Sequence, residues 1–143
     1  MDIRITFPAG KRVDAQFGEH VVHTDQSPAH GGEGSAPEPF DLFLSSLATC
    51  AGIYVLGFCQ ARQIPTAGIT LVQRHQFSEP DHRLEHVELD VLLPPEFPEK
   101  YRVAVVRAAA GCKVKKLLAA PPEIVVSAKH SDGTPFAATA TAA

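Results

Sequence analysis

The longest apolar run of the chain, residues 38–60, constrains most strongly what this sequence can fold into. Pro39 suits the first turn of a helix, where its missing N–H costs nothing. Glu38 and Asp41 place negative charge at the helix start, where the helix dipole favours it. With Pro65 marking the far end, the pattern predicts a helix of about 24 residues, roughly 36 Å long at 1.5 Å per residue. Because this helix is apolar almost all round, it must be buried in protein or in lipid.

Burial in protein is the better interpretation of this helix. The uncharged segment between Asp41 and Arg62 is long enough to span a bilayer. Small and polar residues dilute its hydrophobicity, however: Ser45, Ser46, Thr49, Gly52, Gly57 and Gln60. We therefore expect no membrane association. A chain of 143 residues has little material to cover such a helix on all sides, and a second copy of the chain would cover the stripe left exposed.

The composition narrows the class of protein. The length suits one domain, which we expect to span residues 1–136, and 45% hydrophobic residues can fill its core. A net charge of −3 gives no electrostatic basis for binding nucleic acid. The N-terminal residues show no signal-peptide pattern. Three cysteines, an odd number, suit free thiols in a reducing compartment, so we expect a cytoplasmic protein.

The periodicity of the remaining chain predicts antiparallel sheets around the long helix. Alternating residues predict strands at 2–7, 12–17, 20–24, 68–77, 83–93 and 123–128, and helical spacing predicts helices at 99–110 and 113–119. The order βββ–α–ββ–α(α)–β, with strands in hairpin runs, is typical of the α+β class. Residues 25–37 predict a polar, flexible loop that is either functional or a simple linker. The tail, residues 137–143, has nothing to bury and is expected to be disordered.

Two of the three cysteines have surroundings that suit thiol chemistry. Cys50 lies at the middle of the long helix among small and polar neighbours that leave room for a ligand. Cys112 begins a helical segment and precedes three lysines, and a helix N-terminus and nearby cations both stabilise a thiolate. The alternative is that both are inert packing residues, as buried free cysteines often are. Cys59 is about 900° of helical rotation from Cys50, so it points to the opposite side and is expected to pack in the core.

The sequence predicts no metal site and no cofactor. The cysteines lack the spacing of a zinc site, and His82 and His86 lie about 13 Å apart on a predicted strand. His20 and His23 have opposite strand parity. We interpret the histidines as surface or loop residues, and His30, in the loop before the long helix, is the one most open to a functional role.

Residues 35–50 resemble the signature of the OsmC/Ohr family. The family pattern is a proline, an acidic residue soon after it, a leucine-rich turn and a cysteine eleven residues past the proline, as Pro39 and Cys50 are here. Cys112, within Ala110-Gly111-Cys112-Lys113-Val114, is similar to the family's second cysteine. The order of elements also fits, apart from the tail. The resemblance implies an OsmC-like fold, in which antiparallel sheets wrap the paired central helices of an intertwined homodimer.

The resemblance also implies thiol peroxidase chemistry on small organic hydroperoxides at the dimer interface. Cys50 would attack the peroxide and become a sulfenic acid, Cys112 would condense with it to a disulfide, and an external dithiol would reduce that disulfide. Glu38, Asp41 and Arg12 are the candidates for supporting residues.

The chain departs from the peroxidases of the family at three places. Phe40 follows the proline where they have a glutamate, and the acid comes one residue later, at Asp41, about 180° from Cys50 on an ideal helix. Arg12 is the nearest match to their partner arginine. Residues 113–115 lack the usual proline-serine. The chain thus resembles the less characterised branch of the family.

Three functions remain open on the sequence alone. The first is the peroxidase that uses Cys50 and Cys112. The second is a dimer that binds a small apolar or thiol-containing ligand at its interface without turnover, which Phe40 in place of the acid favours. The third is a thiol transferase or redox sensor that uses the same cysteines.

Overall fold

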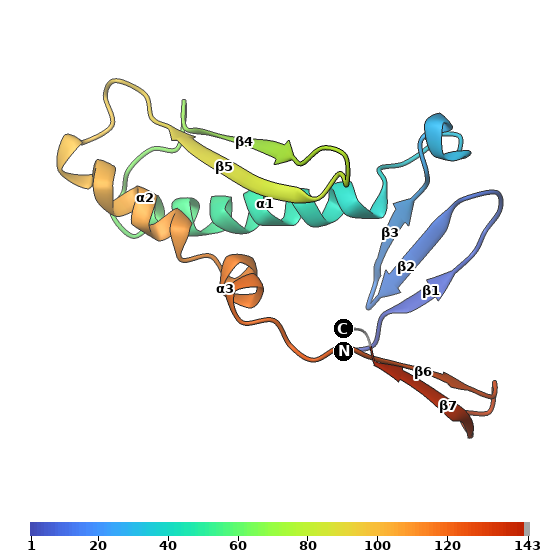
Figure 1. The fold of residues 1–143 in the computed structure, drawn as a ribbon. Coiled ribbons are helices and arrows are strands. Elements are labelled where there is room, and N and C mark those ends of the chain that lie inside the picture. The colour runs from blue at the N-terminus through green and yellow to red at the C-terminus, as the bar shows by residue number, and fades with distance from the viewer. Residues whose placement is uncertain (142–143) are drawn as a thin grey trace.

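The computed structural model describes the backbone of residues 1–141 and the side chains of residues 1–134. Its elements follow the predicted order with one strand added at the end (Figure 1). The strands are β1 (Arg4–Thr6), β2 (Val13–Phe17), β3 (His20–Thr24), β4 (Thr70–Phe77), β5 (Leu84–Leu92), β6 (Val125–Lys129) and β7 (Pro135–Thr141). The helices are α1 (Pro39–Gln60), α2 (Arg102–Ala110) and α3 (Lys113–Ala119), with short 3-10 turns at Pro28–His30 and Glu99–Tyr101. The α+β class and the long central helix are confirmed.

Helix α1 is the axis of the structure. It begins at Pro39, after Glu38 in extended conformation, and the N–H of Ala61 closes it on the carbonyl of Gly57. Its buried residues follow helical spacing along one face: Leu44, Leu47, Ala51, Val55 and Cys59. The β4–β5 hairpin, α2 and α3 lie along this helix (Figure 1).

The core lies where α1 meets α2 and the segment that leads into it. Ala51 and Val105 are fully buried and Ala109 is 3% exposed. Phe97 closes the core from the β5–α2 connection, and Leu71, Leu89 and Val91 pack against it from the hairpin. Burial of a Val-sized side chain contributes about 1.5–3 kcal/mol. These contacts therefore fix how α2 and α3 sit against the middle of α1.

The opposite face of α1 remains uncovered in the single chain. Ile53, which is 65% exposed, and Leu56 lie on this face, and Phe40, Phe43 and Tyr54 are exposed elsewhere on the helix. By length and composition α1 could cross a membrane. The hairpin and α2 pack along one face of it, and 28% of its apolar window is buried within the chain. An exposed apolar stripe of this kind marks an interaction surface.

The N-terminal sheet and the C-terminal hairpin stand apart from this core. Strands β1, β2 and β3 pair antiparallel in that order, and the sheet lies beyond the N-terminal end of α1 (Figure 1). Strands β6 and β7 form a separate two-stranded sheet. The apolar residues Ile3, Ile5 and Phe7 of the first segment are each at least half exposed. Both sheets thus have apolar surface that their own chain does not cover.

The structure differs from the expected disordered tail. Residues 135–141 form β7, which pairs with β6 from Val125 opposite Thr141 to Lys129 opposite Pro135. The missed signal is an Asp-Gly turn: Gly133 has a φ of +88°, and the Thr134 N–H and hydroxyl donate to Asp132 Oδ1. The turn at Asp132 and Gly133 and the backbone pairing of β6 with β7 give this segment its structure. Residues 142 and 143 lie outside the described residues.

The loop before α1 is held by one buried carboxylate. Asp25, 1% exposed, accepts hydrogen bonds from the Ser35 N–H and hydroxyl at 2.9 and 2.8 Å, and from the Gln26 and Glu33 N–H groups. These bonds lower the pKa of Asp25 to about 2, Ser35 contributing most. Gly32 packs so closely that a Cβ there would lie 2.0 Å from the Gln26 carbonyl oxygen. The loop therefore has a defined conformation, in contrast to the flexible loop we expected.

We predict that Asp25→Asn lowers the melting temperature at neutral pH but not at low pH. The folded chain holds the pKa of Asp25 near 2, against an ordinary value of 3.8, so its stabilisation is fully present above about pH 5. That stabilisation is lost as the pH falls from about 4 to 2. Thermal melts of both proteins between pH 7 and pH 2 should show the gap closing in that window. Asp2→Asn, at an exposed position outside the helices, is the control, and a gap that stays constant with pH would contradict the prediction.

Candidate functional site

Cys50 and Cys112 meet where α1 packs against α2 and α3. Cys50 is half-buried on α1, one helical turn after Leu47. Cys112 is fully buried in the two-residue junction between α2 and α3, and Cys50 packs against the core cluster that contains it. Gly111 ends α2, which lets the chain turn and present Cys112 as the N-cap of α3. The two sulfurs that sequence analysis singled out therefore share one site.

The start of α3 stabilises the thiolate of Cys50. The N–H of Val114 faces its sulfur and, together with the N–H and charge of Lys113 and the thiol of Cys112, lowers the pKa of Cys50. Burial acts in the opposite direction but does not prevail. Backbone N–H groups at a helix start have no partner within the helix, so they are available to an anion. This arrangement differs from the sequence-based expectation, which assigned the helix N-terminus to Cys112 itself.

Cys112 and Cys59 have different surroundings. The Cys112 sulfur accepts a hydrogen bond from the Lys115 N–H at 3.4 Å, as an N-cap side chain does. Cys59 is fully buried in the core, and burial raises the pKa of its thiol. The packing role predicted for Cys59 is confirmed. All three cysteines are free thiols in this structure.

An apolar cavity of about 430 Å³ lies between the helices that carry the two cysteines and the β4–β5 hairpin, and its lining includes neither Cys50 nor Cys112. Leu47 of α1 forms one wall, the β5 residues Val87, Leu89 and Val91 form a second, and Val106, Ala109, Ala110 and Leu118 of α2 and α3 close it. Lys115 is the one charged side chain on its lining. Gln73, also on the lining, donates from Nε2 to the Leu44 carbonyl oxygen at 2.9 Å and thereby ties β4 to α1. Nothing in the sequence marks Gln73, because a glutamine on an alternating strand carries no distinguishing pattern.

The three predicted supporting residues lie away from the cysteines within the chain. Glu38 anchors the loop: it accepts from the Ser27 N–H at 2.9 Å and contacts His30 Nδ1 at 3.0 Å. Ser27 and His30 lower its pKa to about 2. Asp41 is exposed nine residues before Cys50, about 13.5 Å along the helix axis. Arg12 is exposed in the turn that leads into β2, outside the strand where we expected it.

The histidines show no metal-binding arrangement. Among residues 1–134, no group of three or more His, Cys, Asp or Glu side chains could hold a metal ion. His30 contacts Ser27 and Glu38, and these contacts help to hold the loop before α1 in place.

Comparison with known proteins identifies the family. The model of the OsmC-like protein family matches residues 32–127, which include both cysteines, and the chain belongs to this family. No curated protein matches the chain significantly.

Solved structures share the fold at low sequence identity. A Psychrobacter arcticus protein described as an osmotic stress induced and detoxification response protein has a TM-score of 0.68 and 23% identity over 80% of this chain and 85% of its own. An OsmC-like protein from Mycoplasma pneumoniae has a TM-score of 0.66 and 17% identity, with 84% and 87% covered. A Legionella pneumophila protein described as an organic hydroperoxide resistance protein has a TM-score of 0.55 and 14% identity, with 83% and 88% covered.

We predict that Cys50 is the most reactive thiol of the chain at pH 7. Its pKa lies below the ordinary value of 9.0, whereas that of Cys59 lies above it. Iodoacetamide alkylation followed by peptide mass spectrometry should label Cys50 at least tenfold faster than Cys59. In 8 M urea the two rates should converge, which serves as the control. Equal rates in the folded protein would show that the start of α3 does not activate Cys50.

Proposed function

We propose that this protein is a thiol-dependent peroxidase that reduces small organic hydroperoxides and works as a homodimer. The observation that carries the proposal is the shared position of Cys50 and Cys112, with the Cys50 pKa lowered by the N–H groups at the start of α3. A peroxidatic cysteine needs thiolate character and a second thiol within reach. The Legionella protein of the same fold is described as a hydroperoxide resistance protein, which is consistent with this activity. Three free cysteines suit the reducing cytoplasm, where we place the protein.

The proposed chemistry uses the two cysteines in sequence. The Cys50 thiolate attacks the distal oxygen of the hydroperoxide, the O–O bond breaks, and the alkoxide leaves and takes a proton to become the alcohol. Cys50 is then a sulfenic acid. The Cys112 thiol attacks this sulfur, a disulfide forms, and one water leaves. An external dithiol reduces the disulfide by thiol–disulfide exchange and restores both thiols.

Under this proposal the chain activates Cys50 without an acid directly after the proline. Phe40 occupies that position and stacks on Phe43, with ring centroids 5.8 Å apart. Activation of Cys50 comes instead from Val114 and Lys113, on the same chain and next to Cys112. Under the proposal, Arg12 and Asp41 would reach the site only from the partner subunit, since neither lies near Cys50 in its own chain.

The homodimer follows from apolar surface that one chain cannot cover. One chain leaves the exposed face of α1 and the apolar residues of the N-terminal segment uncovered. Antiparallel packing of the two α1 helices would cover the exposed face of α1. The sheet that stands beyond the end of α1 is then free to lie against the other subunit (Figure 1).

The alternative function is ligand binding without turnover. The apolar cavity between the β4–β5 hairpin and the helices that carry the cysteines, about 430 Å³, is large enough for a small apolar molecule and favours this candidate. Treatment with a hydroperoxide distinguishes the two functions, because a peroxidase would lose free thiols and a binding protein would keep them.

We predict that excess cumene hydroperoxide removes two of the three thiols of the reduced protein within minutes. Cys50 and Cys112 would form the disulfide and buried Cys59 would remain, so a thiol assay in denaturant should count one thiol per chain. Cys50→Ser should lose no thiol. Cys112→Ser should lose one thiol and give a single dimedone adduct on Cys50.

Cys59→Ala is the matched control for the thiol assay. This variant should still lose two thiols, because Cys59 takes no part in the reaction. Should wild-type protein retain all its thiols while cumyl alcohol raises its melting temperature, the binding function would replace the peroxidase.

We predict that the wild-type protein sediments as a dimer and that Ile53→Glu yields monomers. A charge at the middle of the exposed face of α1 would be buried against the partner helix, which is unfavourable. Analytical ultracentrifugation over a range of concentrations measures the change. Gln60→Glu, exposed at the end of the same helix, should leave the dimer intact. A wild-type monomer at micromolar concentration would contradict the dimer.

A further inference from the structure

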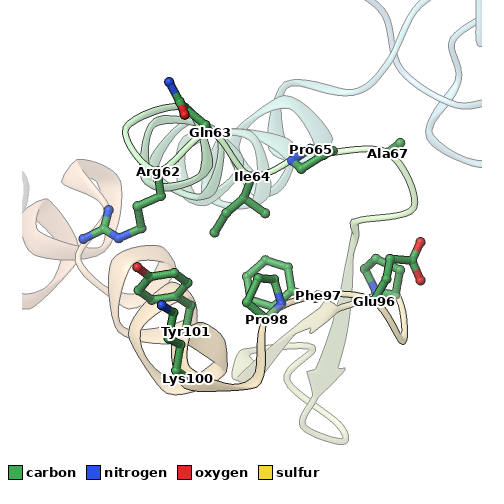
Figure 2. Close-up of a pocket in the computed structure, with 11 residues that line it drawn as sticks. Arg62, Gln63, Ile64, Pro65, Ala67, Glu96, Phe97, Pro98, Lys100 and Tyr101 are labelled. Atoms are coloured by element: carbon green, nitrogen blue, oxygen red, sulfur yellow. The ribbon is translucent and has the colours of Figure 1, made fainter.

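A second cavity, of about 530 Å³, lies at the C-terminal end of α1 and away from the cysteine pair. It is formed by the segment after α1 and by the β5–α2 connection. Figure 2 shows Ile64 facing Phe97 and Pro98 across the cavity. Pro65, Pro94 and Pro98 stiffen the lining, and Phe97 is anchored in the core at 3% exposure. The cavity is therefore built on rigid backbone rather than on a mobile loop.

One side of this cavity carries two cations around an aromatic ring. The Arg62 guanidinium lies 3.8 Å from the centre of the Phe58 ring and 5.6 Å from that of Tyr101, and the Lys100 ammonium lies 4.9 Å from that of Tyr101. Arg62 also donates to the Phe58 carbonyl oxygen at 3.2 Å. Stacking and this bond fix the direction of the guanidinium, which leaves its other N–H groups available.

These cations have no acidic partner among the described residues. The ion pairs of residues 1–134 include neither Arg62 nor Lys100. Glu96, the one acid on the lining, lies on the opposite side of the cavity from both (Figure 2). The carbonyls that end α1 are also occupied: Cys59 O accepts from the Arg62 and Ile64 N–H groups, and Gln60 O accepts from the Gln63 N–H. The positive side of the cavity is therefore not neutralised by the chain itself.

We propose that this cavity binds a small organic monocarboxylate. Its carboxylate would lie at the Tyr101 side of the cavity, where the Arg62 and Lys100 side chains offer charge-assisted hydrogen bonds, and its hydrocarbon body would contact Ile64, Phe97 and Pro98. The apolar lining favours an organic acid over inorganic phosphate. Glu96 at the other side disfavours a second carboxylate, so the site selects monoacids over diacids. This site is independent of the cysteine chemistry, and its test needs no peroxidase activity.

The test is an NMR titration of the ¹⁵N-labelled full-length protein with hexanoate and with 1-hexanol, which has the same chain without the charge. Hexanoate should shift amides of residues 62–67 and 96–101 saturably and bind about tenfold more tightly than hexanol. Adipate, the diacid of the same length, should bind more weakly than hexanoate, and Glu96→Gln should narrow that difference.

Single substitutions test whether Arg62 and Lys100 bind the carboxylate directly or act only through the overall charge of the protein. Arg62→Gln and Lys100→Gln should each weaken hexanoate at least fivefold and leave hexanol unchanged, whereas Lys116→Gln, exposed on α3, should change neither. Lys100→Gln keeps the test valid if the loss of Arg62 disturbs the end of α1. Equal binding of hexanoate and hexanol, shifts elsewhere in the chain, no saturable shift, or full hexanoate affinity in Lys100→Gln would overturn the proposal.

Discussion

The close packing of α1 against α2 is the interaction on which the rest of the structure depends. Ala51 and Ala109 are small and almost fully buried at this contact, so the two helices can approach closely. Val105 fills the space next to them. Because α2 ends only at Gly111, its position fixes where Cys112 and the first N–H groups of α3 lie relative to Cys50. The lowered pKa of Cys50 is thus a consequence of helix packing, and a larger side chain at either alanine would displace the groups that cause it.

Much of this architecture could be predicted from local pattern. Residues 38–60 predicted the central helix because a long apolar run that begins with Pro39 is typical of a helix. Alternating apolar residues predicted β2, β3, β4 and β5 to within a few residues. The pairing of Cys50 with Cys112 rested on family resemblance, since no spacing along a chain shows that residues 62 apart will meet. Which N–H groups face which sulfur depends on the junction at Gly111 and could not be predicted.

Two errors have a common physical origin. The loop at residues 25–37 and the tail from residue 137 were both expected to lack structure because they bury little apolar surface. In each, a single aspartate supplies the order: Asp25 gathers four hydrogen bonds, and Asp132 accepts two from Thr134 at the hairpin turn. Hydrophobic periodicity does not detect such side-chain-to-backbone hydrogen bonds. An Asp-Gly pair, however, does predict a turn from sequence.

The two cavities suggest how one helix can serve two kinds of ligand. The cavity between the β4–β5 hairpin and the helices has Lys115 as its one charged side chain and, under the proposed function, would receive the body of an alkyl hydroperoxide. The cavity at the far end of α1 has Arg62 and Lys100 on its lining. Leu47, on the first, and Arg62, on the edge of the second, are 15 residues apart, or about 22 Å along a helix. The two linings share no residue, so each ligand would contact its own set of side chains. The α1–α2 contact is one route by which an organic acid bound there would affect Cys50, because Phe97 and Tyr101 on the second cavity lead directly into α2.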